Sequence, residues 1–229
     1  MPASSQPAAL GRHNWDMAIL PFTELAGDAT ARVDELALAL ATALREDVDA
    51  DRALARLDEL GREVEFVGGD DLDALHEVLG RRYGFIGNRE EYDHPDNSML
   101  DLVLQRRTGL PIVLSVVYVA VARRAGIALH GVGLAGHYVV GRFEHSAPEL
   151  LDPFAGGTRI TGPPPAAARP WSAHETALRM LNNLVGSYTR RSDLGRAIRA
   201  AELRLELPLE RALAETVGAE LRALRARLN

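Results

Sequence analysis

The apolar run 110–122 constrains the fold more than any other part of the chain, because it is apolar on nearly every side. Pro111 suits the first position of a helix, where its missing N–H leaves no hydrogen bond unmade. Arg123 and Arg124 match the negative end of a helix dipole, and Gly126 supplies a helix stop. The pattern therefore predicts a helix that begins at Pro111, ends at Gly126 and is buried under packed strands.

The first third of the chain repeats apolar residues at helical spacing. The repeats are Val33, Leu36, Ala37, Leu40, Ala41 and Leu44, then Leu54, Leu57, Gly61 and Val64, then Leu72, Leu75, Val78 and Leu79. This part is therefore predicted to be helical from about Thr30. Ahead of it, residues 1–10 are expected to form a loose tail. A segment that docks on the core should follow, anchored by Trp15, Ile19, Leu20 and Phe22.

Shorter signals complete the predicted elements. Ser98 and Asp101 have the spacing of a capping box, which predicts a short helix that ends at Leu104. After Gly126 the pattern predicts short antiparallel strands over 129–134, 138–143 and 150–152. Prolines at 163–165 and 170 end this part, and a helix pair over 178–188 and 194–205 is predicted to precede a last helix over 209–228.

Composition limits the classes of function. The 229 residues include no cysteine, which excludes disulfides, thiolate metal sites and a thiol nucleophile. The net charge is −6, so we expect no nucleic-acid partner, and all 26 basic residues are arginine. The run 110–122 is shorter than the roughly 20 residues that a membrane helix needs, and the N-terminus does not look like a signal peptide. We therefore expect a cytoplasmic protein without a membrane partner.

Several dispersed motifs carry a family resemblance over most of the chain. They are Gly84-Phe85-Ile86-Gly87-Asn88, Tyr92-Asp93, Asn97-Ser98, Gly109-Leu110-Pro111-Ile112-Val113-Leu114, Ala122-Arg123-Arg124-Ala125-Gly126-Ile127, Gly136-His137-Tyr138 and Asp152-Pro153-Phe154-Ala155-Gly156-Gly157. In this order they resemble the SirB family of transglutaminase-like proteins. The resemblance implies an α+β fold: a helical N-terminal part, a papain/transglutaminase-like core with a buried helix on a small antiparallel sheet, and a C-terminal helical tail.

The same resemblance suggests boundaries and a site. The expected parts are an N-terminal segment over 1–27, the core with its helices over 28–162, and a tetratricopeptide-like tail over 171–229. In catalytic relatives Gly-x-Cys opens the core helix, and Pro111 occupies the position of that cysteine here. The resemblance implies a groove in which Pro111, Asn97, Gly136, Tyr138 and Phe154 contact a bound partner.

His137 and Asp152 are the candidate catalytic pair. Their separation of 15 residues lets neighbouring strands hold a hydrogen bond from His Nδ1–H to the carboxylate, with Nε2 facing the start of the helix. The pair could equally be an inherited structural one, and Asp152 could be a turn residue that binds backbone amides.

Ser115 is the hydroxyl one turn after Pro111, and with His137 and Asp152 it would complete a hydrolase triad. Against this role, a serine inside an apolar helix usually bonds the carbonyl four residues before it. A further hypothesis is a bound cation, although no tight ligand spacing supports it. Its ligands would come from Asp93, His94, Asp96, Asn97, His130, His137, His145 and Asp152. We expect no metal and no cofactor.

Two hypotheses of different class result. One is a non-catalytic module that binds a protein or peptide partner in the groove. The other is an acyl-transfer or hydrolase enzyme in which His137 and Asp152 act through Ser115 or a bound water. The sequence determines neither the oligomeric state nor the identity of the partner.

Overall fold

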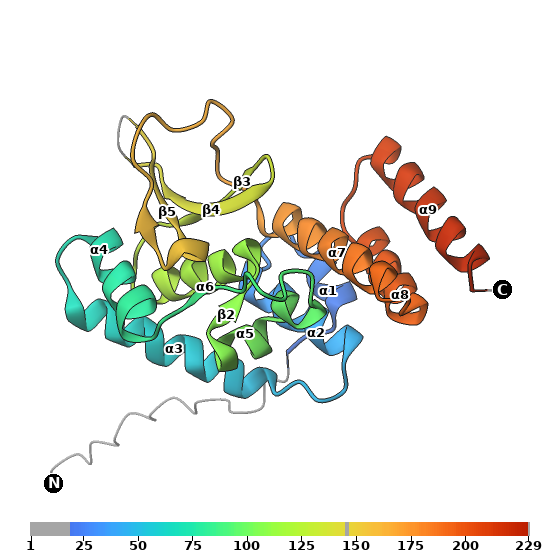
Figure 1. The fold of residues 1–229 in the computed structure, drawn as a ribbon, viewed down its shortest axis with the longest axis horizontal. Helices are drawn as coiled ribbons and strands as arrows, with labels where there is room; N and C mark the ends of the chain where they lie inside the picture. Colours follow the sequence, from blue (N-terminus) through green and yellow to red (C-terminus); the bar gives the residue numbers. More distant parts are fainter. Residues whose placement is uncertain (1–18, 145–146, 229) are drawn as a thin grey trace, which may run out of the picture.

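A helix that is buried over most of its length lies at the centre of the molecule. The computed structural model describes residues 19–144 and 147–228, and α6 (Pro111–Arg124) runs through their middle (Figure 1). Pro111 is its first residue, and Gly126, with a φ of 75°, lies just beyond its end. Burial of nearly the whole helix confirms what its apolar sequence predicts.

An antiparallel sheet covers one side of α6 (Figure 1). Its strands lie in chain order: β3 (His130–Leu134), β4 (His137–Arg142), β5 (Glu149–Asp152) and β6 (Thr158–Arg159). Three were predicted from the sequence, and the two-residue β6 was not, because so short a strand has no periodicity to recognise. Tyr138, Val140 and Leu151 belong to the main core, whereas Val132, Val139 and Leu150 form a small cluster of their own.

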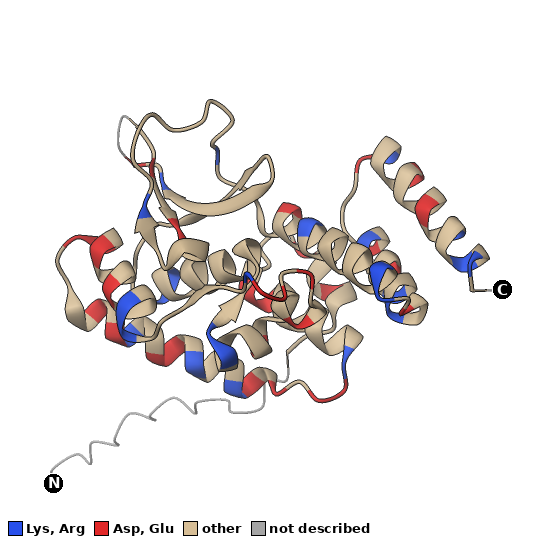
Figure 2. Ribbon diagram, viewed as in Figure 1, with Lys and Arg blue, Asp and Glu red and all other residues tan. Residues whose placement is uncertain are grey.

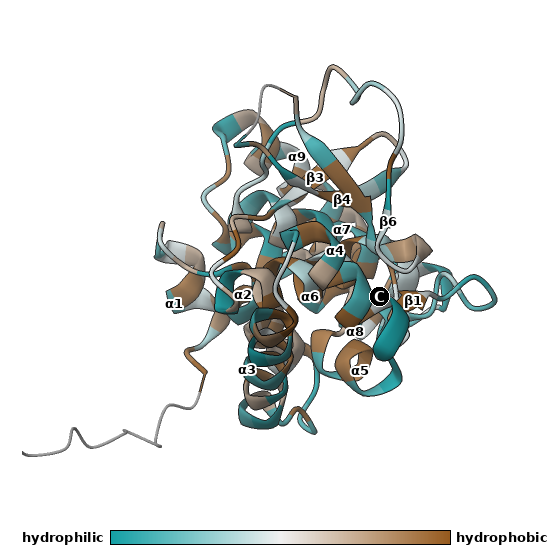
Figure 3. Cartoon of the chain, turned by 90° about the vertical axis from the view of Figure 1, so that its left-hand side faces the viewer, coloured by the Kyte–Doolittle hydropathy of each residue, from teal (hydrophilic) through white to brown (hydrophobic). Residues whose placement is uncertain are grey.

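Helices from the first third of the chain cover the other side of α6. They are α1 (Phe22–Gly27), α2 (Val33–Leu44), α3 (Ala50–Val67), α4 (Asp71–Leu75) and a π-helix, η1 (His76–Arg82). Helix α3 carries its apolar residues on the side that faces the core (Figure 3). Phe22 is buried as predicted for the N-terminal segment, but Leu20 is exposed, and Trp15 lies outside the described residues.

The connection into α6 contains short elements: β1 (Ile86–Gly87), a 3-10 turn η2 (Pro95–Ser98), α5 (Leu100–Arg106) and β2 (Thr108–Gly109), which pairs in parallel with β1. The predicted capping box at Ser98 is wrong. Ser98 ends η2, and α5 starts at Leu100 without a side-chain cap. The Asp101 carboxylate instead accepts a hydrogen bond of 2.9 Å from Arg45, so a long-range ion pair replaces the local cap.

The C-terminal tail consists of α7 (Ala173–Arg190), α8 (Leu194–Glu206) and α9 (Arg211–Ala226). Helix α7 packs into the main core through fully buried side chains, among them Met180, Leu181 and Leu184. Helix α9 contacts the rest through α8, where Leu221 and Leu224 cover Ala201, and it forms one end of the molecule (Figure 1). The tail is thus part of one packed body with the sheet and the N-terminal helices.

The surface mixes both signs of charge. Arginine and acidic residues alternate along α3, α8 and α9 in the view of Figure 2. Arg142 and Arg159 form a network with Asp70 and Glu149 that ties the sheet to the start of α4. No helix in the described part of the chain is long and apolar enough to cross a membrane.

Candidate functional site

His137 and Asp152 form a hydrogen-bonded pair at one end of the two inner strands of the sheet. His137 is the first residue of β4, Asp152 is the last of β5, and their side chains meet with His137 Nε2 at 3.0 Å from Asp152 Oδ2. The His137 side chain is 33% exposed and that of Asp152 is 20% exposed. The predicted contact is present, and solvent reaches both partners.

The nitrogen that binds Asp152 differs from the one expected. The sequence-based prediction assigned Nδ1 to the carboxylate, and the structure assigns Nε2, so that detail is wrong. The strand register pairs Val140 with Leu151, so Asp152 lies diagonally across from His137, and the far nitrogen of the ring reaches its carboxylate. Nδ1 is therefore the nitrogen not used by Asp152 and the one that could meet a ligand.

Asp152 also serves as a turn residue. Its second carboxylate oxygen, Oδ1, accepts hydrogen bonds from the backbone N–H groups of Phe154 at 2.9 Å and Ala155 at 3.4 Å, and so caps the 3-10 turn η3 (Pro153–Ala155). The two interpretations offered by the sequence are both present, one on each oxygen. Hydrogen bonds from amides and from the imidazole favour a fixed carboxylate orientation.

One local hydrogen bond and one contact from a distant helix hold the turn after Asp152. The Asp152 carbonyl accepts from the Gly157 amide at 2.8 Å, and His76 Nδ1 lies 3.0 Å from the Gly156 carbonyl oxygen. His76 belongs to the π-helix, a form often found at functional sites. A side chain at Gly80 would collide with the same Gly156 carbonyl, so glycine permits this close approach.

Tyr118 is a polar residue of this region that the sequence analysis missed. Its side chain is fully buried on α6, its hydroxyl lies against Gly157, and it has no hydrogen-bond partner among the described residues. Burial, and then the nearby Asp152 carboxylate, raise the pKa of the Tyr118 hydroxyl. The hydroxyl therefore stays protonated beside Asp152. Its position seven residues after Pro111, on the same helix face, was the available signal.

Phe154 is the centre of an aromatic and cationic surface. Its ring lies edge-on to His137, with 6.2 Å between the ring centroids, and to Tyr92 at 5.9 Å. The Arg89 guanidinium lies 5.6 Å from its centroid. Gly87 lies directly against the Phe154 ring, and any larger residue at this position would overlap the ring. We call Arg89, Tyr92, His137 and Phe154 the Phe154 surface.

Asn97 organises the loop that carries Tyr92. Its side chain is buried, and its amide nitrogen donates to the carbonyls of Glu91 at 2.6 Å and Tyr92 at 3.2 Å. Its backbone carbonyl accepts from the amide of Leu110 at 3.0 Å, directly before Pro111. Asn97 therefore connects the start of α6 to the Phe154 surface, although its own side chain faces inward.

Pro111, Gly136 and Tyr138 have different surroundings. Pro111 is buried at the first position of α6. Gly136, with a φ of 73°, makes the tight turn between β3 and β4, a backbone geometry that favours glycine. Tyr138 is buried, its hydroxyl lies 2.7 Å from Thr176 Oγ1 in α7, and burial raises the pKa of this hydroxyl to about 12.

Ser115 lies in a different environment from His137. It is fully buried and lines a cavity together with Tyr138. Its hydroxyl has no hydrogen-bond partner within the described residues, so the expected bond to the carbonyl four residues earlier is absent and that expectation is wrong.

The described part of the chain contains no group of three or more histidine, aspartate or glutamate residues that could hold a metal ion. In the loop considered as a cation site, the His94 side chain caps the 3-10 turn η2 by accepting from the Asp96 amide, and the Asp96 carboxylate pairs with Arg106. His145, also part of that hypothesis, lies outside the described residues.

Comparison with known proteins agrees with this architecture. A family model described as the transglutaminase-like superfamily matches residues 28–163. A UPF0162 protein from Xylella fastidiosa (strain Temecula1) is 35% identical over 153 residues, which cover 58% of this chain and 54% of that protein. A UPF0162 protein from Pseudomonas aeruginosa is 38% identical over 116 residues, 48% of this chain and 42% of the relative.

A shorter match is to part of a mouse protein. F-box only protein 21 of Mus musculus is 37% identical over 83 residues, 36% of this chain but 13% of the mouse protein. The chain thus spans about half the length of the Xylella relative and smaller shares of the others. No solved structure gives a significant match.

Proposed function

The chain belongs to the transglutaminase-like superfamily, and we propose that its cysteine-free core is a non-catalytic module that binds a peptide segment of a protein partner on the Phe154 surface. Within that superfamily we assign it to the SirB type, with α7 and α8 as a tetratricopeptide-like pair. The observation that carries the proposal is the retention of a solvent-reachable His137–Asp152 pair beside Phe154 in a chain that has no thiol to activate.

The Phe154 surface offers complementary chemistry to a peptide. Tyr92 is 44% exposed and Phe154 is half-buried, so an apolar side chain could pack on an already ordered aromatic pair. Arg89 is exposed above the ring and could receive a carboxylate, and His137 Nδ1 could bond a backbone group. The rings are held by Gly87 and by the turn at Asp152, so binding would order few new side chains.

The enzymatic alternative requires a nucleophile other than sulfur. Ser115 shares its cavity with Tyr138, and no hydrogen bond joins it to His137 within the described residues. A water molecule activated by His137 is the second candidate nucleophile, and the ester-hydrolysis assay described below tests it. We therefore favour peptide binding over hydrolysis as the function of the Phe154 surface.

The test is selection of a random peptide library displayed on phage against the immobilised full chain. Peptides enriched on this protein should lose at least tenfold in affinity for Phe154→Ala and Tyr92→Ala. They should keep their affinity for Phe66→Ala, which removes a 91% exposed phenylalanine from α3. Peptides that bind all variants equally would contradict the proposed surface. Hydrolysis of an activated ester that His137→Ala abolishes would instead favour the enzyme.

A further inference from the structure

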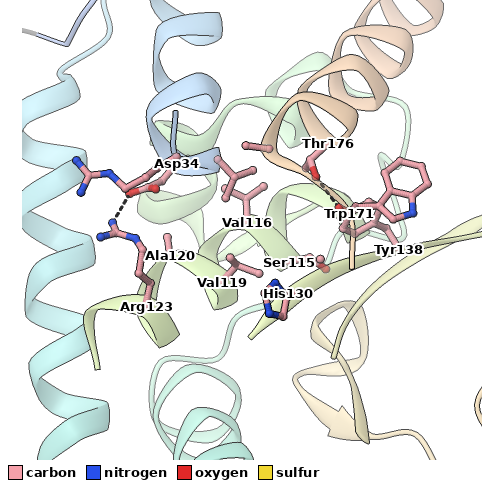
Figure 4. Close-up of a pocket in the computed structure, with 14 residues that line it drawn as sticks. Asp34, Ser115, Val116, Val119, Ala120, Arg123, His130, Tyr138, Trp171 and Thr176 are labelled. Carbon is pink, nitrogen blue, oxygen red and sulfur yellow. Dashed lines mark hydrogen bonds and ion pairs between the residues drawn. The ribbon is translucent and has the colours of Figure 1, made fainter. Parts of the chain in front are cut away.

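A cavity separate from the Phe154 surface opens between α2, α6, the strands β3 and β4, and the start of α7 (Figure 4). It has a volume of about 170 Å³. Figure 4 shows that its two ends differ: Asp34 and Arg123 lie at one end, Tyr138, Trp171 and Thr176 lie at the other, and Val116 and Val119 of α6 lie between them. We call the first of these the arginine end.

The charges that a ligand could reach at the arginine end are positive. The side chain of Arg123 is 40% exposed and that of Arg32 is 52% exposed, and both line the cavity. Asp34 is the one carboxylate that lines it within the described residues, but it is 1% exposed. Its Oδ2 is covered by Arg124 at 2.8 Å and by Arg123 at 3.2 Å. The reachable part of this end is therefore cationic.

Both arginines keep N–H groups that no described residue accepts. A guanidinium carries five N–H donors. Arg123 uses Nη2 for Asp34, and Arg32 uses Nε and Nη2 for Glu35. Nε and Nη1 of Arg123 and Nη1 of Arg32 therefore have no acceptor within the described part of the chain. Glu35 and Asp58, the other carboxylates of this ion-pair cluster, do not line the cavity.

The polar residues away from the arginine end offer a ligand little. Ser115, Tyr138 and Thr176 line the cavity but are buried. Thr176 Oγ1 donates to the Ser172 carbonyl at 2.8 Å, so the Tyr138 hydroxyl, 2.7 Å away, donates to Thr176. The two hydroxyls thus satisfy each other. What remains for a ligand to contact at this end is the Trp171 ring and the valines of α6.

These features select a ligand with one negative charge and a small apolar body. A carboxylate would accept charge-assisted hydrogen bonds from the unused N–H groups, whereas an ammonium ion would meet like charges. A second carboxylate, at the other end, would find no free donor there. A cavity of about 150 Å³ accommodates benzene, so this one suits a single ring. We propose that the cavity binds a small aromatic monocarboxylate of the benzoate class, with its carboxylate at Arg123 and Arg32 and its ring against Val119 and Trp171.

The experiment uses the full chain with benzoate, benzamide and acetate as probes, and measures their dissociation constants by ligand-observed NMR. Benzoate should bind at least about tenfold more tightly than benzamide, which lacks the charge, and than acetate, which lacks the ring. Arg123→Gln should weaken benzoate by about tenfold and leave benzamide unchanged, because it removes charged donors. Val119→Phe should fill the cavity and abolish benzoate binding.

Arg106→Gln is the matched control. Arg106 is also an arginine in the last turn of a helix, is 49% exposed and pairs with an aspartate, Asp96, but it lies outside the cavity. This variant should leave the affinity for benzoate unchanged. In Arg123→Gln the buried Asp34 keeps its bond from Arg124, so that variant should fold.

If Val119→Phe does not fold, the comparison of Arg123→Gln with Arg106→Gln decides. Equal affinities of the wild type for benzoate and benzamide, or the absence of benzoate binding, would overturn the proposal. So would a loss of benzoate affinity that is as large in Arg106→Gln as in Arg123→Gln, because the effect would then come from the net charge of the protein.

Discussion

Arg179 in α7 holds the backbone at His137 in place. Its Nη2 donates to the His137 carbonyl at 3.0 Å and its Nη1 donates to the Leu134 carbonyl at 3.2 Å, so one guanidinium spans both ends of the β3–β4 turn. The same group lies over the rings of Tyr138 and Trp171 at 5.6 and 5.7 Å. The tail therefore contributes directly to the position of the candidate site.

Replacement of this residue tests that coupling. Arg179→Ala should lower the free energy of unfolding by about 1.5–3 kcal/mol, because the partly buried carbonyls of Leu134 and His137 lose a charged donor. Urea denaturation followed by circular dichroism would measure the change. Arg211→Ala removes an arginine that is 93% exposed and should alter stability by less than about 0.5 kcal/mol. Equal stabilities of the two variants would show that the Arg179 contacts do not hold the turn.

Truncation after Pro170 tests the role of the whole tail. The cut would uncover the core surface that α7 buries with Met180, Leu181 and Leu184. Each such side chain is worth about 1.5–3 kcal/mol when buried, so the truncated protein should melt at a lower temperature or aggregate. Differential scanning calorimetry with size-exclusion chromatography would measure both. A monomeric core with an unchanged melting transition would instead make the tail an independent arm.

A cysteine placed at Pro111 tests whether the ancestral geometry persists. A series of contacts runs from the start of α6 through Asn97 and Tyr92 to Phe154 and His137. A thiol at a helix N-terminus near an imidazole has a pKa below the free value of about 8.5 and reacts as thiolate. Pro111 is buried, so Pro111→Cys should react with iodoacetamide faster than free cysteine at pH 7 only if the thiolate formed beside His137 outweighs the shielding by neighbouring side chains.

The control for that experiment is the double variant Pro111→Cys with His137→Ala. It keeps the helix terminus and removes the imidazole, so any rate lost between the two variants belongs to His137. A single-variant thiol that is no more reactive than free cysteine would show that the start of α6 no longer faces the histidine.

The sequence predicted the parts of the fold that depend on local pattern. The buried helix from Pro111, the helices of the tail and three strands all follow from periodicity and from helix-ending residues. The pairing of His137 with Asp152 followed from strand spacing. These features are set by residues close in sequence or by a simple alternation between neighbouring strands.

What the sequence did not reveal depends on contacts between distant residues. Asp101 was expected to cap its own helix but pairs with Arg45, because a largely covered guanidinium offers a stronger partner than a local amide. The ring nitrogen of His137 that meets Asp152 depends on the register of β4 against β5, which a spacing of 15 residues does not specify. The contact of His76 with Gly156 spans 80 residues, and neither residue carries a local signal for it.

A charged residue at the start of α7 should make the free energy of unfolding depend on pH in the acidic range. Ser172 and Glu175 form a capping box there, and the Arg169 guanidinium, aided by the Ser172 amide, lowers the pKa of the Glu175 carboxyl to about 2. A lowered pKa in the folded state means that the ionised form stabilises the fold at any pH above the unfolded value of about 4.3. That contribution should be lost as the pH falls from about 4.3 toward 2.

Glu175→Gln tests this directly, since glutamine can still accept from the Ser172 amide but carries no charge. Glu175 is 39% exposed, so solvent screening limits the expected loss at pH 7 to at most about 1 kcal/mol. Melting temperatures measured from pH 7 to pH 2 should show a gap between wild type and variant that is constant above pH 5 and closes near pH 2. Glu215→Gln, in an exposed ion pair on α9, serves as the matched control. A gap for Glu175→Gln that stays the same down to pH 2 would contradict the assigned role of its charge.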